Sequence, residues 1–172
     1  MSRYLTATAA AAMLMVAASH LEAQTTCTGN PCTVQVTASA TVNDVLRLTL
    51  SSNTANLGTP TDVDYDAGYK DAAGPTASIK SNRPWHVDVV GNTASFSYSG
   101  SLTDPNKPAS DLQWGLVAGT YGNTMGTSAV LASGANGTGN ASQAIFFRTL
   151  WSWTSGVPGS YGLVINFTLA AP

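Results

Sequence analysis

Charged side chains are scarce in this 172-residue chain: they make up 9% of it, and Glu22 is its only glutamate. Seven Lys and Arg residues are scattered among nine acidic residues, for a net charge of −2. No basic stripe or polybasic segment forms, so neither nucleic acid nor an anionic lipid surface is expected as a partner. Solubility must come from Ser, Thr, Asn and Gly, a composition typical of extracellular β proteins.

Side chains for catalysis are also few. His20 and His86 are the only histidines, and no Gly-x-Ser-x-Gly sequence presents a serine nucleophile. Two aspartates could serve a glycosidase, but no spacing singles out such a pair. The sequence therefore predicts a protein that is not an enzyme.

The N-terminus reads as a leader. Arg3 supplies one positive charge, and the apolar run over residues 7–18 is too short to span a bilayer. The small residue Ala23, just before Gln24, completes the order of a secretory signal peptide over residues 1–23. We expect export to the periplasm, the cell surface or the extracellular space, with no membrane-spanning segment in the mature chain.

The only two cysteines, Cys27 and Cys32, lie close together. In an exported chain they predict one local disulfide within an N-terminal segment, residues 24–32. The loop that it closes is short, so it should add only about 2 kcal/mol of stability. Zinc is not expected, because no second pair of Cys or His supplies the remaining ligands.

Apolar and polar residues alternate with the period-2 pattern of strands along most of the remaining chain. Pro84 predicts an edge position or a bulge, and Gly91-Asn92 predicts a hairpin turn. With no amphipathic helix after the leader, the fold class is all-β: an antiparallel β-sandwich or barrel, one domain over residues 33–172. The predicted strands cover residues 33–42, 46–50, 61–66, 76–90, 94–98, 112–116, 130–131, 144–153 and 160–170.

The last predicted strand alternates most cleanly. One face must bury large apolar groups, so we expect this strand to be central to the core. The inward residues are Tyr161, Leu163, Ile165, Phe167 and Leu169.

Asp62, Asp64 and Asp66 have the opening spacing of an EF-hand-type calcium loop, but Ala67 and Ala73 stand where that loop needs Gly and Glu. On a strand, the three carboxylates would share one face. They would then be a solvated edge that prevents aggregation or, as the alternative, a calcium site. No other cofactor is expected.

Four tryptophans occupy alternating strand positions: Trp85, Trp114, Trp151 and Trp153. At least two or three of them should lie in the core. An exposed one on a loop would favour sugar binding, because aromatic faces stack on sugars.

Four segments together resemble a known family. They are the N-terminal alternating strand, a Leu-rich strand ending near Leu57-Gly58, a Trp-containing middle strand and the closing run from Pro158 to Leu169. They are similar to small exported bacterial Ig-like sandwiches: spore coat protein U and Csu-type fimbrial subunits, and more loosely WxL-like surface domains. In such subunits, the N-terminal strand of one copy completes the sandwich of the next.

The resemblance implies a structural or adhesive surface protein whose partner is itself or a related subunit. The residues that it implies as the donated strand are Val34, Val36, Ala38, Ala40 and Val42. Pairing of residues 33–42 within their own domain stays open, as does a carbohydrate- or calcium-binding module as the alternative function.

Overall fold

The computed structural model describes residues 26–172, so the predicted signal peptide lies outside the described residues. The described chain falls into two units, an N-terminal segment ending at Thr41 and a domain, Val42–Pro172. The segment contains the predicted Cys27–Cys32 disulfide, with 5.8 Å between the Cα atoms. The predicted strand over residues 33–42 does not form, and these residues are exposed. A strand requires a partner ladder, and this stretch has none within the described chain.

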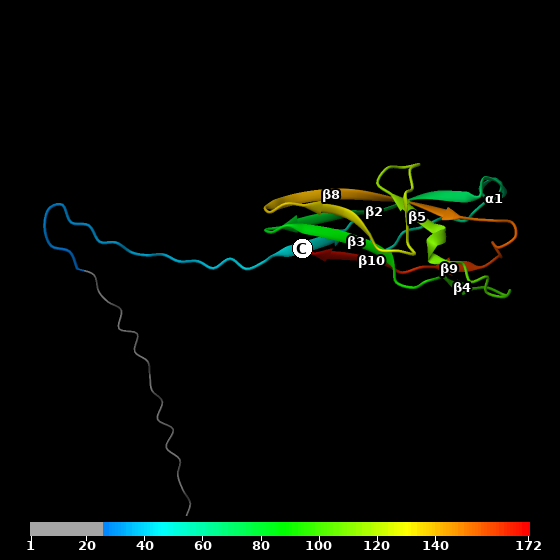
Figure 1. Cartoon of the computed structure of the whole chain (residues 1–172), viewed down its shortest axis with the longest axis horizontal. Helices are drawn as coiled ribbons and strands as arrows, with labels where there is room; N and C mark the ends of the chain where they lie inside the picture. Colours follow the sequence, from blue (N-terminus) through cyan, green and yellow to red (C-terminus); the bar gives the residue numbers. More distant parts are fainter. Residues whose placement is uncertain (1–25) are drawn as a thin grey trace, which may run out of the picture. The chain divides into compact units, whose positions relative to one another are not determined.

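The domain is built from antiparallel sheets in a sandwich-like arrangement, which confirms the predicted all-β class (Figure 1). In order across the larger sheet lie β1 (Leu46–Leu50), β2 (Tyr69–Ser81), β8 (Thr138–Leu150), β5 (Leu112–Gly115) and β6 (Asn123–Thr124). Across the smaller sheet lie β10 (Ile165–Ala170), β3 (Trp85–Gly91) and β7 (Ala129–Gly134). A two-stranded ribbon pairs β4 (Ser97–Ser99) with β9 (Ser160–Gly162), and two short helices complete the domain, α1 (Asp62–Ala67) and a 3₁₀ turn (Ala109–Asp111).

The core lies between the two main sheets and follows the strand period. Alternate residues of β3, among them Trp85 and Val87, are buried, and Ile79 of β2 and Phe147 of β8 are fully buried. Trp85 and Trp114 belong to this core, so at least two of the four tryptophans lie where the alternation predicted.

Pro84 separates two strands of different sheets, where the sequence predicted a single interrupted strand over residues 76–90. β2 ends at Ser81, and β3 begins at Trp85 in the smaller sheet. Proline has no N–H to continue a ladder, so the chain leaves one sheet here and enters the other.

The predicted hairpin across Gly91-Asn92 is wrong. β3 pairs with β10 and β7, while β4 pairs with β9. The Gly91 N–H donates to the Met125 carbonyl and the Asn92 N–H to the Val164 carbonyl, so neither closes a two-residue turn. Distant segments thus satisfy the groups that a local turn would have used.

The predicted short strand over residues 61–66 is also wrong, because α1 occupies this stretch. The N–H and the hydroxyl of Thr61 both donate to the Asp64 carboxylate, at 2.7 and 2.8 Å. Gly68 ends the helix in the left-handed conformation, at φ 81°. Capping at both ends outweighs an alternation that extends over only six residues.

The stretch 160–170 is divided between β9 and β10, and β10 is an edge strand, whereas the sequence predicted one central strand. The five residues predicted to point inward do pack against the core, but each is only partly buried. This incomplete burial is the starting point for the functional site.

Candidate functional site

A groove of about 490 Å³ opens between the first and last strands of the sandwich. One wall contains Leu50, Ala55 and Leu57, and the other contains residues 161–165 and Phe167. Leu112 and Phe147 also line the groove, and both have no exposed surface, so they form its floor. The groove therefore reaches the core from the side of the domain.

Both walls end in unpaired strand edges. Within residues 26–172, β1 is the outermost strand of the larger sheet and pairs only with β2, and β10 is the outermost strand of the smaller sheet and pairs only with β3. The two strands lie next to one another across the open side. An edge strand leaves alternate N–H and C=O groups without a ladder partner, which makes it a template for another strand.

Apolar side chains on this side of the domain are only half covered. Ten of them pack against the core without becoming fully buried: Leu46, Leu48, Leu50, Ala55, Leu57, Tyr161, Leu163, Ile165, Phe167 and Leu169. Many of the fully buried core side chains come instead from β2, β3 and β8. Each of these strands has a paired neighbour on both sides. The core is thus incomplete along the β1–β10 side.

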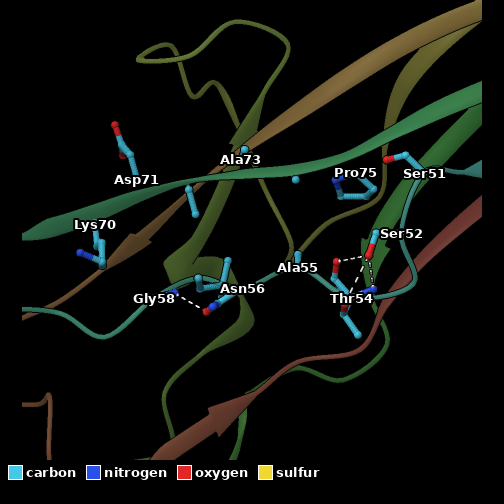
Figure 2. A pocket seen from close by; sticks show the side chains of 13 residues that line it. Ser51, Ser52, Thr54, Ala55, Asn56, Gly58, Lys70, Asp71, Ala73 and Pro75 are labelled. Carbon is cyan, nitrogen blue, oxygen red and sulfur yellow. Dashed lines mark hydrogen bonds between the residues drawn. The ribbon is translucent and has the colours of Figure 1, made fainter.

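The segment 51–58, predicted as loop, is irregular and continues the wall beyond β1. Its last bonds to β2 join Ser51 and Thr76, each N–H donating to an oxygen of the other residue at 2.9 Å. Beyond Ser51, side chains hold the turns: the Ser52 hydroxyl accepts from the Thr54 N–H at 3.1 Å, and Asn56 accepts from the Gly58 N–H at 2.9 Å (Figure 2).

A second cavity, of about 390 Å³, lies between this segment and the first half of β2, residues 70–75 (Figure 2). β1 covers β2 only from Ala77 to Ser81. Residues 52–58 do not pair with β2, so a space remains between them and the sheet.

The far end of this wall is fixed by a charged contact. Lys70 Nζ lies 2.9 Å from Asp64 Oδ2, and the Lys70 stem passes so close to Gly58 that a Cβ there would lie 2.7 Å from Cε. Hydrogen bonds from the Thr61 backbone, followed by the bond from Lys70, lower the pKa of Asp64 to about 2.

The three aspartates predicted as a calcium alternative do not share one face. Successive helical residues are about 100° apart, so Asp64 points away from Asp62 and Asp66 on α1. Asp64 binds Thr61 and Lys70, while Asp66 accepts a hydrogen bond from the Trp153 indole. Within residues 26–172, no group of three His, Cys, Asp or Glu side chains is placed to hold a metal ion.

The His86 imidazole lies 3.3 Å from the Asp88 carboxylate, and both side chains are about one-third exposed on the outer face of β3. No serine or threonine hydroxyl in the described part of the chain bonds to this histidine, and the two cysteines are joined in the disulfide. The pair therefore lacks a nucleophile.

The predicted donor strand presents its apolar residues to solvent. Val34 is 46% exposed, Val36 87% and Val42 82%. The chain enters the domain just after them, where the Val45 N–H donates to Asn82 Oδ1 and Asn82 Nδ2 donates to the Asn43 carbonyl, both at 2.8 Å.

The sequence predicted the residues of the 161–169 wall as an inward apolar row, but it did not predict a groove, and it gave most of the opposite wall as loop. Residues 51–60 are rich in Ser, Asn and Thr and indicate only a loop. The available signal was the two-residue spacing of Ala55 and Leu57. It repeats the spacing of Leu46, Leu48 and Leu50, but the two sets are offset by an odd number of positions.

No protein-family model matches this chain, and no curated protein matches it. Among the described residues, no helix has both the length and the apolar character needed to cross a membrane.

Proposed function

We propose that this protein is an exported, non-enzymatic structural subunit that assembles by strand addition. In this proposal, residues 33–42 of one copy occupy the groove between β1 and β10 of the next copy, at the cell surface or in the periplasm. The observation that carries it is a groove with an apolar floor, flanked by two unpaired strand edges and half-covered apolar rows.

The pattern of the donor supports the match. Its alternate residues are apolar and would point into the groove, while the intervening Gln35, Thr37, Ser39 and Thr41 would face solvent. A ten-residue strand spans about 33 Å, enough to follow the whole wall made by residues 161–165 and Phe167. One added strand would pair with both free edges and cover both half-buried rows.

A neighbouring copy is favoured over the same chain as the acceptor. For residues 33–42 to fold back onto β1, the chain would have to reverse at Asn43-Asp44. That reversal would break the two bonds with Asn82 and the ion pair between Asp44 and Arg83. Donation to a second copy preserves these contacts and gives a head-to-tail interface, which generates filaments when it does not close.

The decisive experiment compares two charged substitutions in mature protein, residues 24–172. Val36→Asp would put a carboxylate into the groove and abolish assembly, because an unpaired charge is costly to bury. Thr37→Asp, one residue along, adds the same charge on the solvent face and should assemble like the wild type. Sedimentation velocity and electron microscopy report the size and shape of the assemblies.

Two results would contradict strand addition between copies. One is equal assembly of both variants. The other is a strictly monomeric wild type whose thermal midpoint falls in Val36→Asp but not in Thr37→Asp, which would indicate pairing within the same chain.

A further inference from the structure

Trp153 is an exposed tryptophan on the loop between β8 and β9, in the situation that would favour sugar binding. Its side chain is 65% exposed, although it packs against one end of a cluster of aromatic rings. The Tyr65 ring lies 4.8 Å from the Trp153 ring between centroids, at an interplanar angle of 31°, and covers one of its faces. Most of the Trp153 side chain is therefore open to solvent.

This aromatic pair is held rigidly. The Trp153 indole N–H donates to Asp66 Oδ1 at 3.0 Å, and the Tyr65 hydroxyl donates to the Gly156 carbonyl at 3.1 Å. Behind Tyr65, Trp151 packs on both Tyr65 and Tyr161, at 6.1 and 5.3 Å between ring centroids.

The loop behind the pair is fixed as well. Two more tyrosine hydroxyls donate to consecutive carbonyls, Tyr161 to Val157 and Tyr98 to Pro158, each at 2.7 Å. The Ser152 carbonyl also accepts the Gly156 N–H at 2.8 Å. A ligand that stacks on Trp153 therefore loses little entropy in ordering the loop.

Polar residues lie near Trp153 in the fold and along the chain. Asp66 uses only one carboxylate oxygen on Trp153, and Asp62 lies one helical turn away on the same face of α1. Thr154 and Ser155, the next two residues along the chain, are exposed. An aromatic plane bordered by hydroxyls and carboxylates suits a ligand with an apolar C–H face and hydroxyls at its rim.

We infer that Trp153 and Tyr65 form a carbohydrate-binding site for a neutral sugar, with one pyranose ring stacked on Trp153 and its hydroxyls bonded to Asp66 and the 152–155 loop. Asp62 and Asp66 disfavour an anionic ligand, since the segment 151–159 contains no Lys or Arg to offset them. A single exposed indole is also far smaller than the roughly 800 Å² per partner of a stable protein interface.

The site lies at the opposite end of the sandwich from the entry of the donor segment. α1 and the 151–159 loop flank Tyr69 and Leu150, which pair at one end of β2 and β8 (Figure 1). Asn82, which anchors residues 43–45, follows the other end of β2. Trp153 and Tyr65 do not line the groove, so sugar binding and strand addition can be tested separately, although Tyr161 belongs both to the groove wall and to the ring stack behind Tyr65.

The test uses mature protein and a panel of neutral hexasaccharides: cellohexaose, xylohexaose, mannohexaose, maltohexaose and chitohexaose. Perturbation of the Trp153 indole N–H in an NMR titration reports contact at the site, and calorimetry gives the affinity. With one stacked ring, we expect a Kd on the order of 0.1–1 mM for at least one sugar. Trp153→Ala should weaken binding at least about tenfold, and Trp153→Phe should retain part of it.

Val130→Ala is the matched control, because it truncates another exposed apolar side chain, on β7, and should leave binding unchanged. A heparin hexasaccharide tests the charge argument. The inference is overturned if no neutral sugar moves the Trp153 resonance up to about 10 mM. It is also overturned if Trp153→Ala binds as well as the wild type, or if only the anionic sugar binds.

Discussion

Apolar residues on β1 and on β2 differ in how deeply they are buried. Leu48 of β1 and Ile79 of β2 face each other across the β1–β2 pairing, yet Ile79 is fully buried and Leu48 only partly. β2 has β1 on one side and β8 on the other, whereas β1 has a neighbour on one side only. Burial is thus set by which strands are present, and the half-covered residues lie where a strand has a neighbour on one side only.

The largest expected effect comes from truncating this facing pair. Ile79→Ala should lower the free energy of unfolding by about 2–5 kcal/mol, because it leaves a cavity in a closed part of the core. Leu48→Ala should cost only about 1–2 kcal/mol in monomeric Val36→Asp protein, since part of that side chain already contacts water. Chemical denaturation of the two variants in this background measures both values. Equal costs would mean that the β1 side is as closed as the β2 side.

An intermediate effect is expected from filling the open side. Ala55→Arg places a long charged side chain in the groove wall, so it should block assembly while changing the monomer little. Thr168→Arg, on the outer face of β10, should leave assembly intact. Binding to the folded state raises apparent stability by mass action, by about 2.7 kcal/mol when the partner is present at one hundred times its Kd. The thermal midpoint should therefore rise with protein concentration in the wild type and in Thr168→Arg. A midpoint of Ala55→Arg that rises equally with concentration would place the donor strand elsewhere.

The smallest effect concerns the charged contact at the end of the 51–58 wall. The pKa of Asp64 is lowered from 3.8 to about 2, so its bonds to Thr61 and Lys70 stabilise the fold above pH 3.8, and this contribution is lost as the pH falls through 2. Amide protection factors, which correct for the intrinsic pH dependence of exchange, should therefore fall near residues 56–64 between about pH 4 and 2, while those of β3 change less.

The cause of this shift can be separated by substitution. Lys70→Met should move the pKa of Asp64 back toward 3.8 in an NMR titration, but only in part, because the Thr61 hydrogen bonds remain. Lys80→Met, which also removes one lysine charge but lies on β2 near its far end, should leave this pKa where it is. If Lys70→Met left the pKa of Asp64 unchanged, the Lys70–Asp64 contact would not contribute to the shift.

Local pattern was a good guide wherever one strand face is enclosed. The alternation of Trp85, Val87 and Val89 and of Leu112 and Trp114 predicted buried faces that the structure has. The spacing of Cys27 and Cys32 predicted the disulfide. These features depend on residues two to five positions apart, which the sequence displays directly.

Pattern failed where two local signals competed or where strands chose distant partners. Residues 61–66 alternate like a strand, but the Thr61 and Asp64 cap together with Gly68 makes them a helix. The Gly/Asn/Ser-rich stretch before residue 144 indicated a loop, yet β8 extends back to Thr138 because β2 supplies a ladder along its length. Nothing near Gly91 showed that β3 would pair with β10, more than seventy residues later.

By itself, then, the sequence determined that this chain forms antiparallel β structure with one apolar face per strand, because side chains alternate along any extended backbone. Only the tertiary structure decided which strands became neighbours, and so which apolar rows were closed and which were left open. Strand order depends on contacts between residues far apart in the chain, and the period-2 pattern is the same for an edge strand and for a central one. The groove between β1 and β10 and the pairing of Tyr65 with Trp153 both follow from that long-range choice.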